Sequence, residues 1–297
     1  KKEIKLLEGN WSINEPLIFP SDFIINIQPG FSLDIKENAF IVSNSALNFN
    51  GSSDKKIKIF SQSGGKGILV LNANNKSKIN HTVFEGLKNP SFNKWSVTGA
   101  VTFYQSLVDI RNTTFKNGNS EDSLNIVRSP FYIDNIYILG SKSDALDIDF
   151  SDGEIKNLFI KYSGNDGLDI SGSKIYANSI FIDTSGDKAL SIGENSQLEG
   201  SNFQINNAEI AITSKDLSNI DIKDVFVKNS KLGITAFQKK PEYGGAFIRI
   251  VNYRENKVRK NYLLEPNSNI FVNNEEYKSN VDLVIPFLYG EEYGKKS

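Results

Sequence analysis

The chain has 297 residues, a formal net charge of −1 and no cysteine. Without cysteine it has neither a disulfide framework nor a cysteine-based metal site or nucleophile. The lack of a basic excess argues against nucleic-acid binding, and no apolar run reaches the roughly 18 residues that a membrane-spanning helix needs.

The first part of the chain predicts a short lead-in followed by strands. Because the chain starts with Lys1 and contains no methionine, we expect it to be part of a longer product, with a signal peptide or additional domains outside this sequence. Segments 16–35 and 45–63 have apolar and polar residues in alternation between Gly, Asn and Ser clusters. That pattern is typical of short strands joined by turns.

A 22-residue repeat dominates the middle of the chain. An apolar anchor recurs at this spacing: Leu124, Leu146, Leu168, Leu190, Ile212 and Ile234. A second large apolar residue lies nine positions before each anchor, which predicts a second buried row: Phe115, Tyr137, Phe159, Phe181, Phe203 and Val225. Alternation around the anchors indicates a strand with one buried face. A leucine-rich repeat is excluded, because its L-x-x-L-x-L consensus and helical segment are missing.

The repeat predicts an all-β fold, a single-stranded right-handed parallel β-helix whose 22-residue coils each contain about three short strands. We expect an N-terminal lead-in or cap at 1–15, the parallel β-helix at 16–250 and a C-terminal cap at 251–297. Residues 88–99 interrupt the period and predict a loop that leaves the coil. A cap is expected because a β-helix has to cover its terminal edge strands, and 281–290 is the segment expected to do so.

Charged residues occupy the outward positions around the anchors. Asp144, Asp166 and Lys188 come two residues before an anchor, where the turn enters the strand. Asp147 and Asp169 come directly after an anchor and are expected to point outward. Further charged residues flank this face or extend it: Asp149, Asp187, Arg128, Glu194, Lys215 and Lys239.

Such stacking has an electrostatic cost that the sequence must offset. Carboxylates about 4.8 Å apart on adjacent coils repel by roughly 3.5 kcal/mol at an effective dielectric near 20, less when exposed. A bound cation, a proton shared between carboxylates, or interleaved Lys and Arg would each relieve the repulsion. Alternatively, Asp144 and Asp166 cap backbone N–H groups of their turns. That explanation suits Asp147, Asp149 and Asp169 less well, because strands disfavour Asp.

The coils resemble the pectin-lyase-like superfamily of right-handed parallel β-helices. The order "KSDALDI", "GNDGLDI", "GDKALSIGENS" is similar to the catalytic coils of polygalacturonase-type glycoside hydrolases. The resemblance covers residues 140–220 and puts Asp144 and Asp166 on that family's motif carboxylates, and Lys215 on its lysine. The chain departs from the motif at Asn165, Lys188 and Thr213, where the family has Asp, His and Arg. One carboxylate of the inverting mechanism is therefore missing at these positions.

A weaker resemblance is to β-helical segments of large exported bacterial proteins that carry spore-coat-H-like kinase domains. It rests on "QKKPEYGGA" (238–246) and "LYGEEYGK" (288–295). The fold resemblance implies an extracellular, periplasmic or cell-surface protein. Because no apolar run is long enough to span a membrane, we expect no membrane insertion of the chain.

Two functions stay open at this point, with a polysaccharide as the expected partner and no nucleic acid. The first is a glycan lyase or hydrolase that uses the Asp/Lys face. A lyase would hold Ca²⁺ on Asp144, Asp147, Asp166 and Asp169, with Lys188, Lys215 or Arg128 as the base. A hydrolase would pair Asp144 or Asp166 with Asp147, Asp149 or Asp187. The remaining charged residues would bind substrate: Asp149, Asp187, Arg128, Glu194 and Lys239.

The second function is a non-catalytic, glycan-binding or structural β-helix module of a larger exported protein. Exposed aromatic side chains would then stack on sugar rings, and Phe92, Trp95 and Tyr243 are the candidates. A raised lysine pKa among carboxylates counts against a lysine base. His81, the only histidine, lies several coils from the charged face and is expected to be structural.

Overall fold

The structure is a computed structural model that describes residues 2–290 and 293. The chain forms two compact units, Lys1–Gly153 and Glu154–Ser297. Each unit is built from strands that pair in parallel with the strands of the next coil, with a repeat of about 22 residues. The protein is an all-β parallel β-helix.

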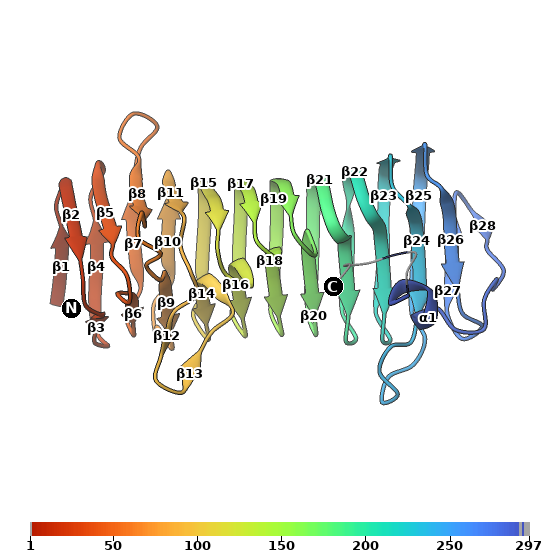
Figure 1. The fold of residues 1–297 in the computed structure, drawn as a ribbon, viewed down its shortest axis with the longest axis horizontal. Coiled ribbons are helices and arrows are strands. Elements are labelled where there is room, and N and C mark those ends of the chain that lie inside the picture. Colours follow the sequence, from red (N-terminus) through yellow and green to blue (C-terminus); the bar gives the residue numbers. More distant parts are fainter. Residues whose placement is uncertain (1, 291–292, 294–297) are drawn as a thin grey trace. The chain divides into compact units, whose positions relative to one another are not determined.

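In unit 1, each coil contributes one strand to each of three parallel ladders (Figure 1). The first ladder contains β1 (Lys2–Leu6), β4 (Phe23–Ile27), β7 (Leu47–Asn50), β10 (Ser77–Asn80) and the first parts of β15 (Val108–Gly118) and β17 (Phe131–Ser141). The second ladder contains β2 (Gly9–Ile13), β5 (Phe31–Ile35), β8 (Ile57–Phe60), β11 (Thr82–Glu85) and the later parts of β15 and β17. The third ladder contains β3 (Leu17–Phe19), β6 (Ile41–Ser43), β9 (Ile68–Leu71), β14 (Gly99–Tyr104), β16 (Asp122–Val127) and β18 (Asp144–Asp149).

Unit 2 repeats the same three-ladder coil. Its first and second ladders are formed by successive parts of β21 (Lys174–Gly193), β22 (Gln197–Lys215), β23 (Asn219–Lys228) and β25 (Phe247–Asn256), with β27 (Asn269–Val272) added to the first. Its third ladder contains β20 (Leu168–Ser171), the ends of β21 and β22, β24 (Leu232–Phe237) and β26 (Lys260–Leu264). Three further elements are β19 (Asp152–Ser163), β28 (Glu275–Glu276) and helix α1 (Ile285–Leu288).

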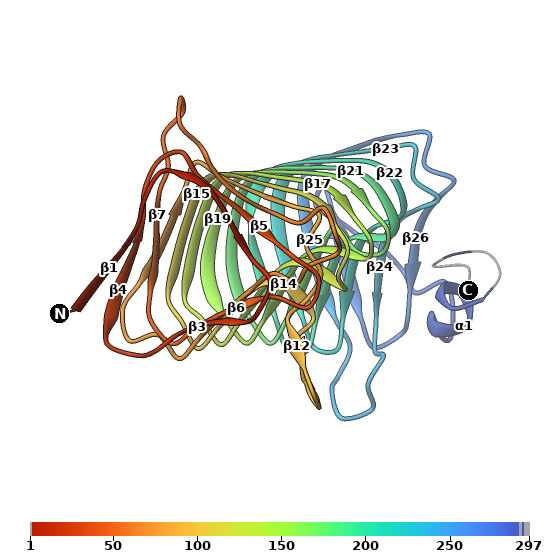
Figure 2. The ribbon, with the colours of Figure 1, turned by 60° about the vertical axis from the view of Figure 1, so that its left-hand side comes forward.

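The predicted anchors form the inner side of the third ladder. Leu124 and Leu146 in unit 1, and Leu168, Leu190 and Ile212 in unit 2, are fully buried. They stack in register, with Leu124 opposite Leu146 and Leu190 opposite Ile212. Figure 2 shows the successive turns of unit 1 as nested outlines around this interior. The prediction of a buried apolar stripe with a strand period is confirmed.

The second predicted row is correct only in part. Phe203 and Val225 are buried, but Tyr137 is 42% exposed. The reason is register: Phe115 lies opposite Ile138, so this coil is one residue longer than the repeat at that point. A slip of one residue moves a side chain to the other face of a strand. The same effect turns Phe159 and Phe181 outward, where their rings stack with centroids 4.7 Å apart.

Polar side chains hold the corners of the coil. Asn112 and Asn135 adopt left-handed backbone conformations between the first and second ladders, with φ of 48° and 57°, and the Asn135 amide donates to Asn112 Oδ1 at 2.7 Å. After the third ladder, the N–H of Ser129 donates to Ser151 Oγ at 3.0 Å. Ser173 and Ser196 repeat this contact in unit 2 at 3.1 Å. Asn tolerates the left-handed region, so single-residue corners recur without strain.

Two segments leave the regular coils. The predicted loop at 88–99 contains the antiparallel hairpin of β12 (Ser91–Phe92) and β13 (Trp95–Ser96), which projects from unit 1 (Figure 2). Near the C-terminus, Val284 and Leu288 pack on the outer side of the third ladder of unit 2, against Ile210, Leu232 and Phe237. None of the described helices is long and apolar enough to cross a membrane.

Strands of the parallel ladders extend into both regions that the sequence predicted to be lead-in or cap, 1–15 and 251–297. β1 and β2 lie within 1–15 and pair in parallel with β4 and β5. β27 lies within 251–297 and pairs in parallel with β25. The segment 281–290, expected to cover an edge, covers the outer face of the third ladder in unit 2.

We predict that the anchor row carries much of the stability. Leu124→Ala should lower the free energy of unfolding by about 2–5 kcal/mol, because a fully buried leucine leaves a cavity. Urea titration followed by circular dichroism measures the change. Leu107→Ala, at a leucine that is 43% exposed, is the matched control and should change it by less than about 1 kcal/mol. Equal losses in both variants would contradict the assignment.

Candidate functional site

The predicted charged residues lie on the outer side of the third ladder, in two groups that belong to different units. In unit 1, β18 carries Asp144, Asp147 and Asp149. In unit 2, one cavity of about 340 Å³ is lined by six of the charged residues singled out from the sequence: Asp166, Asp169, Asp187, Lys188, Lys215 and Lys239. Asn165 also lines it, together with Leu288, Tyr289, Gly290 and Tyr293 from the C-terminal segment.

The unit 1 group is held by amide and hydroxyl contacts on neighbouring coils. Asn125 donates to Asp147 Oδ2 at 2.8 Å and to Asp149 Oδ2 at 3.4 Å. Asp122 lies opposite Asp144 on the adjacent strand and is 2% exposed. The sequence did not single out Asp122 as a site residue, although it occupies the same repeat position as Asp144.

Burial raises the pKa of Asp122 to about 8, and the charges of Asp144, Glu121 and Asp149 add to the effect, while a hydrogen bond with the Thr98 side chain opposes it. Its Oδ2 atom is buried and has no hydrogen-bond partner among the described residues. This carboxyl therefore keeps its proton near neutral pH. The repulsion expected from stacked carboxylates is relieved here by protonation.

Lys188 is the centre of the unit 2 cavity. It is 4% exposed, its Nζ atom forms an ion pair and a hydrogen bond with Asp187, and it lies 3.7 Å from Asp166 Oδ1. The backbone N–H of Lys188 also donates to Asp166 Oδ1 at 2.9 Å. Burial lowers the pKa of Lys188, but the charges of Asp166 and Asp187 outweigh it and the pKa is raised. Lys188 is therefore a permanent cation.

Asp169 faces Lys215 across the cavity. Its Oδ1 atom is buried without a hydrogen-bond partner among the described residues and lies 3.9 Å from Lys215 Nζ. The Lys215 ammonium donates instead to Ser191 Oγ at 2.8 Å. Burial raises the pKa of Asp169, with the nearby Lys215 charge opposing the change and Asp166 adding to it.

Burial is the main cause of the raised pKa of Asp169, and the charges of Lys215 and Lys188 oppose it. Three carboxylates, Asp166, Asp169 and Asp187, line the cavity together with three lysines: the shielded Lys188 and Lys215 and the exposed Lys239. Burial also raises the pKa of Asp187, against the charge of Lys188, but the direct contact with Lys188 favours its ionised form. Asp169 makes the longer contact with its lysine, 3.9 Å from Lys215 Nζ, so it is the better candidate for a carboxyl that holds a proton.

The donor set of the cavity does not fit a calcium ion. Ca²⁺ takes six to eight oxygen ligands, whereas Asp166 and Asp187 already share the Lys188 ammonium and Asp169 faces Lys215. No group of three or more His, Cys, Asp or Glu suited to a metal ion occurs in residues 2–290 and 293. Interleaved lysines, one of the three arrangements expected from the sequence, neutralise these carboxylates.

The C-terminal segment supplies an aromatic wall that the sequence did not single out. Leu288 is anchored in an apolar cluster with Val284, Ile210 and Leu232, and the N–H of Val284 donates to Glu265 Oε1 at 2.7 Å. Tyr289 follows directly and is 53% exposed. Its ring centroid lies 6.0 Å from Lys188 Nζ and 5.3 Å from Lys239 Nζ. No periodic signal marks Tyr289, because it lies outside the repeat.

The other predicted binding residues lie beside the cavity or in the other unit. Glu194 forms an ion pair with Lys240, and Asp216 accepts hydrogen bonds from the N–H groups of Lys239 and Lys240 at 2.6 and 2.7 Å. This fixes the turn that carries Lys239 to the cavity. Arg128, in unit 1, lies 5.8 Å from the ring centroid of Phe150.

Comparison with known proteins finds similarity of fold only. No family profile matches the chain, and no curated protein is similar to it. Among solved structures, the chain is similar to the catalytic domain of a GH87 α-1,3-glucanase in complex with nigerose, with 12% identity over 91% of this chain and 63% of that chain (TM-score 0.49). It thus spans less than two thirds of the glucanase chain.

Two further structures are similar over most of this chain. An alginate lyase from Paenibacillus sp. str. FPU-7 has 11% identity over 81% of this chain and 93% of its own (TM-score 0.35). Tailspike protein 3 of bacteriophage CBA120 has 9% identity over 95% of this chain and 58% of its own (TM-score 0.38). These identities and scores are too low to transfer an activity.

We predict that Asp122 makes stability depend on pH. Its pKa is about 8 in the folded protein against 3.8 ordinarily, so the folded state binds more protons and stability falls as pH rises between these values. Asp122→Asn should match the wild type at pH 4 and exceed it at pH 9 by up to about 5 kcal/mol.

Melting temperatures at both pH values test this. Asp54→Asn, at an exposed carboxylate, is the control and should give the same difference from the wild type at both pH values. A pH-independent effect of Asp122→Asn would contradict the assignment.

Proposed function

We propose that the protein is a carbohydrate-active β-helix that hydrolyses a glycosidic bond in the unit 2 cavity. The observation that carries this proposal is one cavity in which burial raises the pKa of Asp169 and in which Lys188 pairs with two further carboxylates, Asp166 and Asp187. Glycoside hydrolysis uses such a pair, one carboxyl as acid and one carboxylate as base or nucleophile. The resemblance of residues 140–220 to polygalacturonase-type coils covers this segment, but the carboxylates that it matches are Asp144 and Asp166.

In this mechanism Asp169 is the general acid. Its carboxyl proton moves to the glycosidic oxygen while the bond from that oxygen to the anomeric carbon breaks. A water molecule adds to the anomeric carbon and gives its proton to Asp187. Lys188 holds Asp187 Oδ2, and Asp187 Oδ1 is buried without a hydrogen-bond partner among the described residues. That oxygen is the acceptor we assign to the water proton.

Hydrolysis fits this site better than β-elimination. A lyase needs a base that removes a proton from the sugar carbon next to a carboxylate, and the raised pKa of Lys188 makes it a poor base. Lys215 is held by Ser191 and lies next to Asp169. In this mechanism both lysines instead stabilise the ionised form of the neighbouring carboxylates by ion pairing. Calcium has no step in this mechanism.

Non-catalytic glycan binding is the second candidate. It is favoured by the exposed ring of Tyr289 at the cavity, since sugar rings stack on exposed aromatic faces and polar groups beside them fix orientation. A polysaccharide ligand in either case would agree with an extracellular, periplasmic or cell-surface location. An assay for the release of reducing ends from polysaccharides distinguishes hydrolysis from non-catalytic binding.

We predict that the wild type releases reducing ends from a neutral or acidic polysaccharide and gives no unsaturated product absorbing at 235 nm. Asp169→Asn and Asp187→Asn should each lower kcat by about 10²–10⁴-fold, as expected for loss of a general acid or base. The wild-type rate should fall as pH rises through the raised pKa of Asp169, because the acid is then ionised.

Asp221→Asn is the matched control, since Asp221 pairs with Arg249 on the exposed first ladder. Full activity in Asp169→Asn would refute the assigned acid. A wild type that binds polysaccharide without releasing reducing ends would leave glycan binding as the function.

We predict that Tyr289 contributes to sugar binding rather than to the chemical step. Tyr289→Ala should raise KM or Kd for a glycan about tenfold with kcat nearly unchanged, because stacking on an aromatic ring is worth on the order of 1 kcal/mol. Tyr289→Phe keeps the ring and should resemble the wild type. Tyr176→Ala, at a tyrosine 48% exposed on another ladder of unit 2, is the control. Equal constants for Tyr289→Ala and Tyr289→Phe would contradict stacking.

A further inference from the structure

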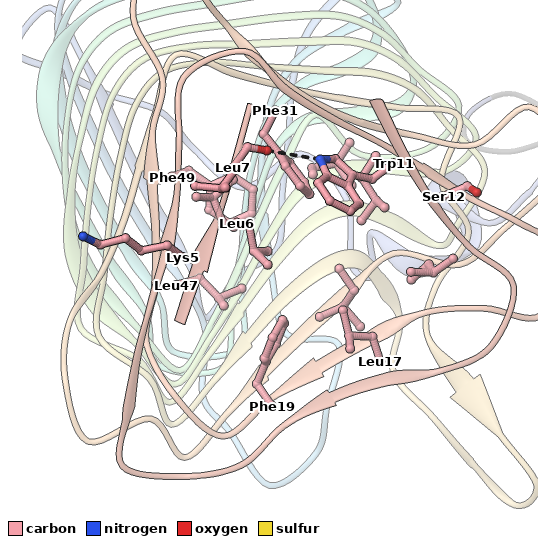
Figure 3. Close-up of a pocket in the computed structure, with 15 residues that line it drawn as sticks. Lys5, Leu6, Leu7, Trp11, Ser12, Leu17, Phe19, Phe31, Leu47 and Phe49 are labelled. Carbon is pink, nitrogen blue, oxygen red and sulfur yellow. Dashed lines mark hydrogen bonds between the residues drawn. The ribbon is translucent and has the colours of Figure 1, made fainter. Parts of the chain in front are cut away.

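Three phenylalanines of unit 2 face outward from the coil. Large apolar side chains normally point inward, as Phe31 and Phe49 do in unit 1 (Figure 3). On the second ladder of unit 2, Phe159, Phe181 and Phe226 are instead half-buried, and each is flanked along its strand by two buried residues of the interior. The outer face of this ladder therefore offers aromatic surface to a ligand.

Two of these rings belong to a column of side chains that lines one groove. Phe181 lies opposite Gln204 on the next strand. Phe226 lies opposite Gln204 on one side and opposite Arg254 on the other. All four side chains line a cavity of about 300 Å³, a volume at the lower end of the range for ligand pockets. We refer to this cavity as the second-ladder groove.

The second-ladder groove combines aromatic faces with hydrogen-bonding groups and a cation. Gln204 is exposed, and its amide both donates and accepts. Asp224 also lines the groove; its Oδ1 atom accepts from the Asn252 amide at 3.0 Å, and a carboxylate has further lone pairs for a hydroxyl. The exposed guanidinium of Arg254 lies 5.9 Å from the ring centroid of Phe226. A sugar has the matching groups, since its C–H face packs on an aromatic ring and its hydroxyls bond to amides and carboxylates.

The charges on this face indicate which kind of sugar fits. Arg254 forms no ion pair within residues 2–290 and 293, and the same holds there for Lys161 and Lys228, at outward positions of the same ladder. Two carboxylates, Asp183 and Asp224, lie on this face or in the groove. Three cations thus outnumber two carboxylates, and a guanidinium binds a carboxylate through two parallel hydrogen bonds. A ligand that carries carboxylates of its own is complementary to this surface.

We propose that the second-ladder groove of unit 2 is a non-catalytic binding site for a carboxylated polysaccharide. Arg254 binds the carboxylate of one sugar, whose ring packs on Phe226, and Gln204 bonds to hydroxyls. Lys161 and Lys228 attract carboxylates of neighbouring sugars along the chain. The groove is on the second ladder, whereas the proposed hydrolytic cavity is on the third, so this site goes beyond the proposed function and does not depend on it.

A nucleic acid is a poorer match for the same groove. Aromatic rings and cations also bind single-stranded nucleic acids, but such binders have a strong basic excess and this chain has a net charge of −1. Asp183 and Asp224 would repel phosphates, whereas they can accept hydrogen bonds from sugar hydroxyls.

Calorimetric titration with polygalacturonate and alginate, each compared with its methyl ester, tests the charge recognition. The wild type should bind at least one of the two polyuronates, and its methyl ester about tenfold more weakly. Arg254→Gln should weaken binding of the polyuronate about tenfold, and Arg254→Lys, which keeps the charge, should weaken it less. Arg249→Gln is the matched control, because Arg249 lies on the same strand but pairs with Asp221 on the first ladder. It should bind as the wild type does.

Four results would overturn the proposal. They are no binding of either polyuronate, equal binding of the methyl ester, unchanged binding in Arg254→Gln, and a single-stranded oligonucleotide that binds more tightly than the polyuronates and is weakened by Arg254→Gln. Phe226→Leu keeps an apolar side chain without the flat ring and should weaken binding about fivefold, whereas Phe271→Leu, at a half-buried phenylalanine of the first ladder, should not. Equal constants for these two variants would contradict the aromatic contact. Melting temperatures near that of the wild type show that the variants are folded.

The outcome is independent of hydrolysis in the unit 2 cavity. Asp169→Asn should leave the effect of Arg254→Gln on polyuronate binding unchanged, because mutations at separate sites act additively. A wild type that releases no reducing ends but loses polyuronate binding in Arg254→Gln would refute the hydrolase and retain this site. An effect of Arg254→Gln that disappears in the Asp169→Asn background would overturn the separate site.

Discussion

Parallel backbone pairing between coils, in strict register, is the constraint on which the rest of each unit depends. Once Leu190 lies opposite Ile212, the neighbours of each anchor also lie opposite one another, and like residues stack about 4.8 Å apart. Apolar stacks inside the coil gain from this proximity. Like charges stacked outside the coil repel each other, so the charges on the outer face of the third ladder have to be neutralised residue by residue.

The two units neutralise their stacked carboxylates by different means. In unit 1, Asp122 is buried next to Asp144 and holds a proton, while Asn125 donates to Asp147. In unit 2, Lys188 replaces a carboxylate in the same column and pairs with Asp166 and Asp187. A structural stack does not require a buried carboxyl with a raised pKa in a cavity, which is why Asp169, rather than the stacking itself, is the basis of the proposed chemistry.

The outer face of the third ladder in unit 2 changes from charged to apolar side chains along the stack. Asp166 and Lys188 are followed in the same column by Ile210 and Leu232, which the C-terminal segment covers through Val284 and Leu288. The apolar half thus anchors the segment and the polar half faces the cavity. Tyr289 stands at the boundary, and its position follows from the docking of Leu288 one residue earlier.

The sequence by itself determined the coil, its period, the buried anchors and the alignment of charges on one face. The reason is that residues one repeat apart in the sequence lie side by side on adjacent coils when the coils stack in register. It also identified Asp166, Asp169, Asp187, Lys188, Lys215 and Lys239, which the structure gathers around one cavity. Only the tertiary structure decided that Tyr137 turns outward, because a single added residue at a corner reverses a strand face. It alone brought Tyr289 to Lys188, because docking of a non-repeating segment depends on side-chain packing between residues far apart in the chain.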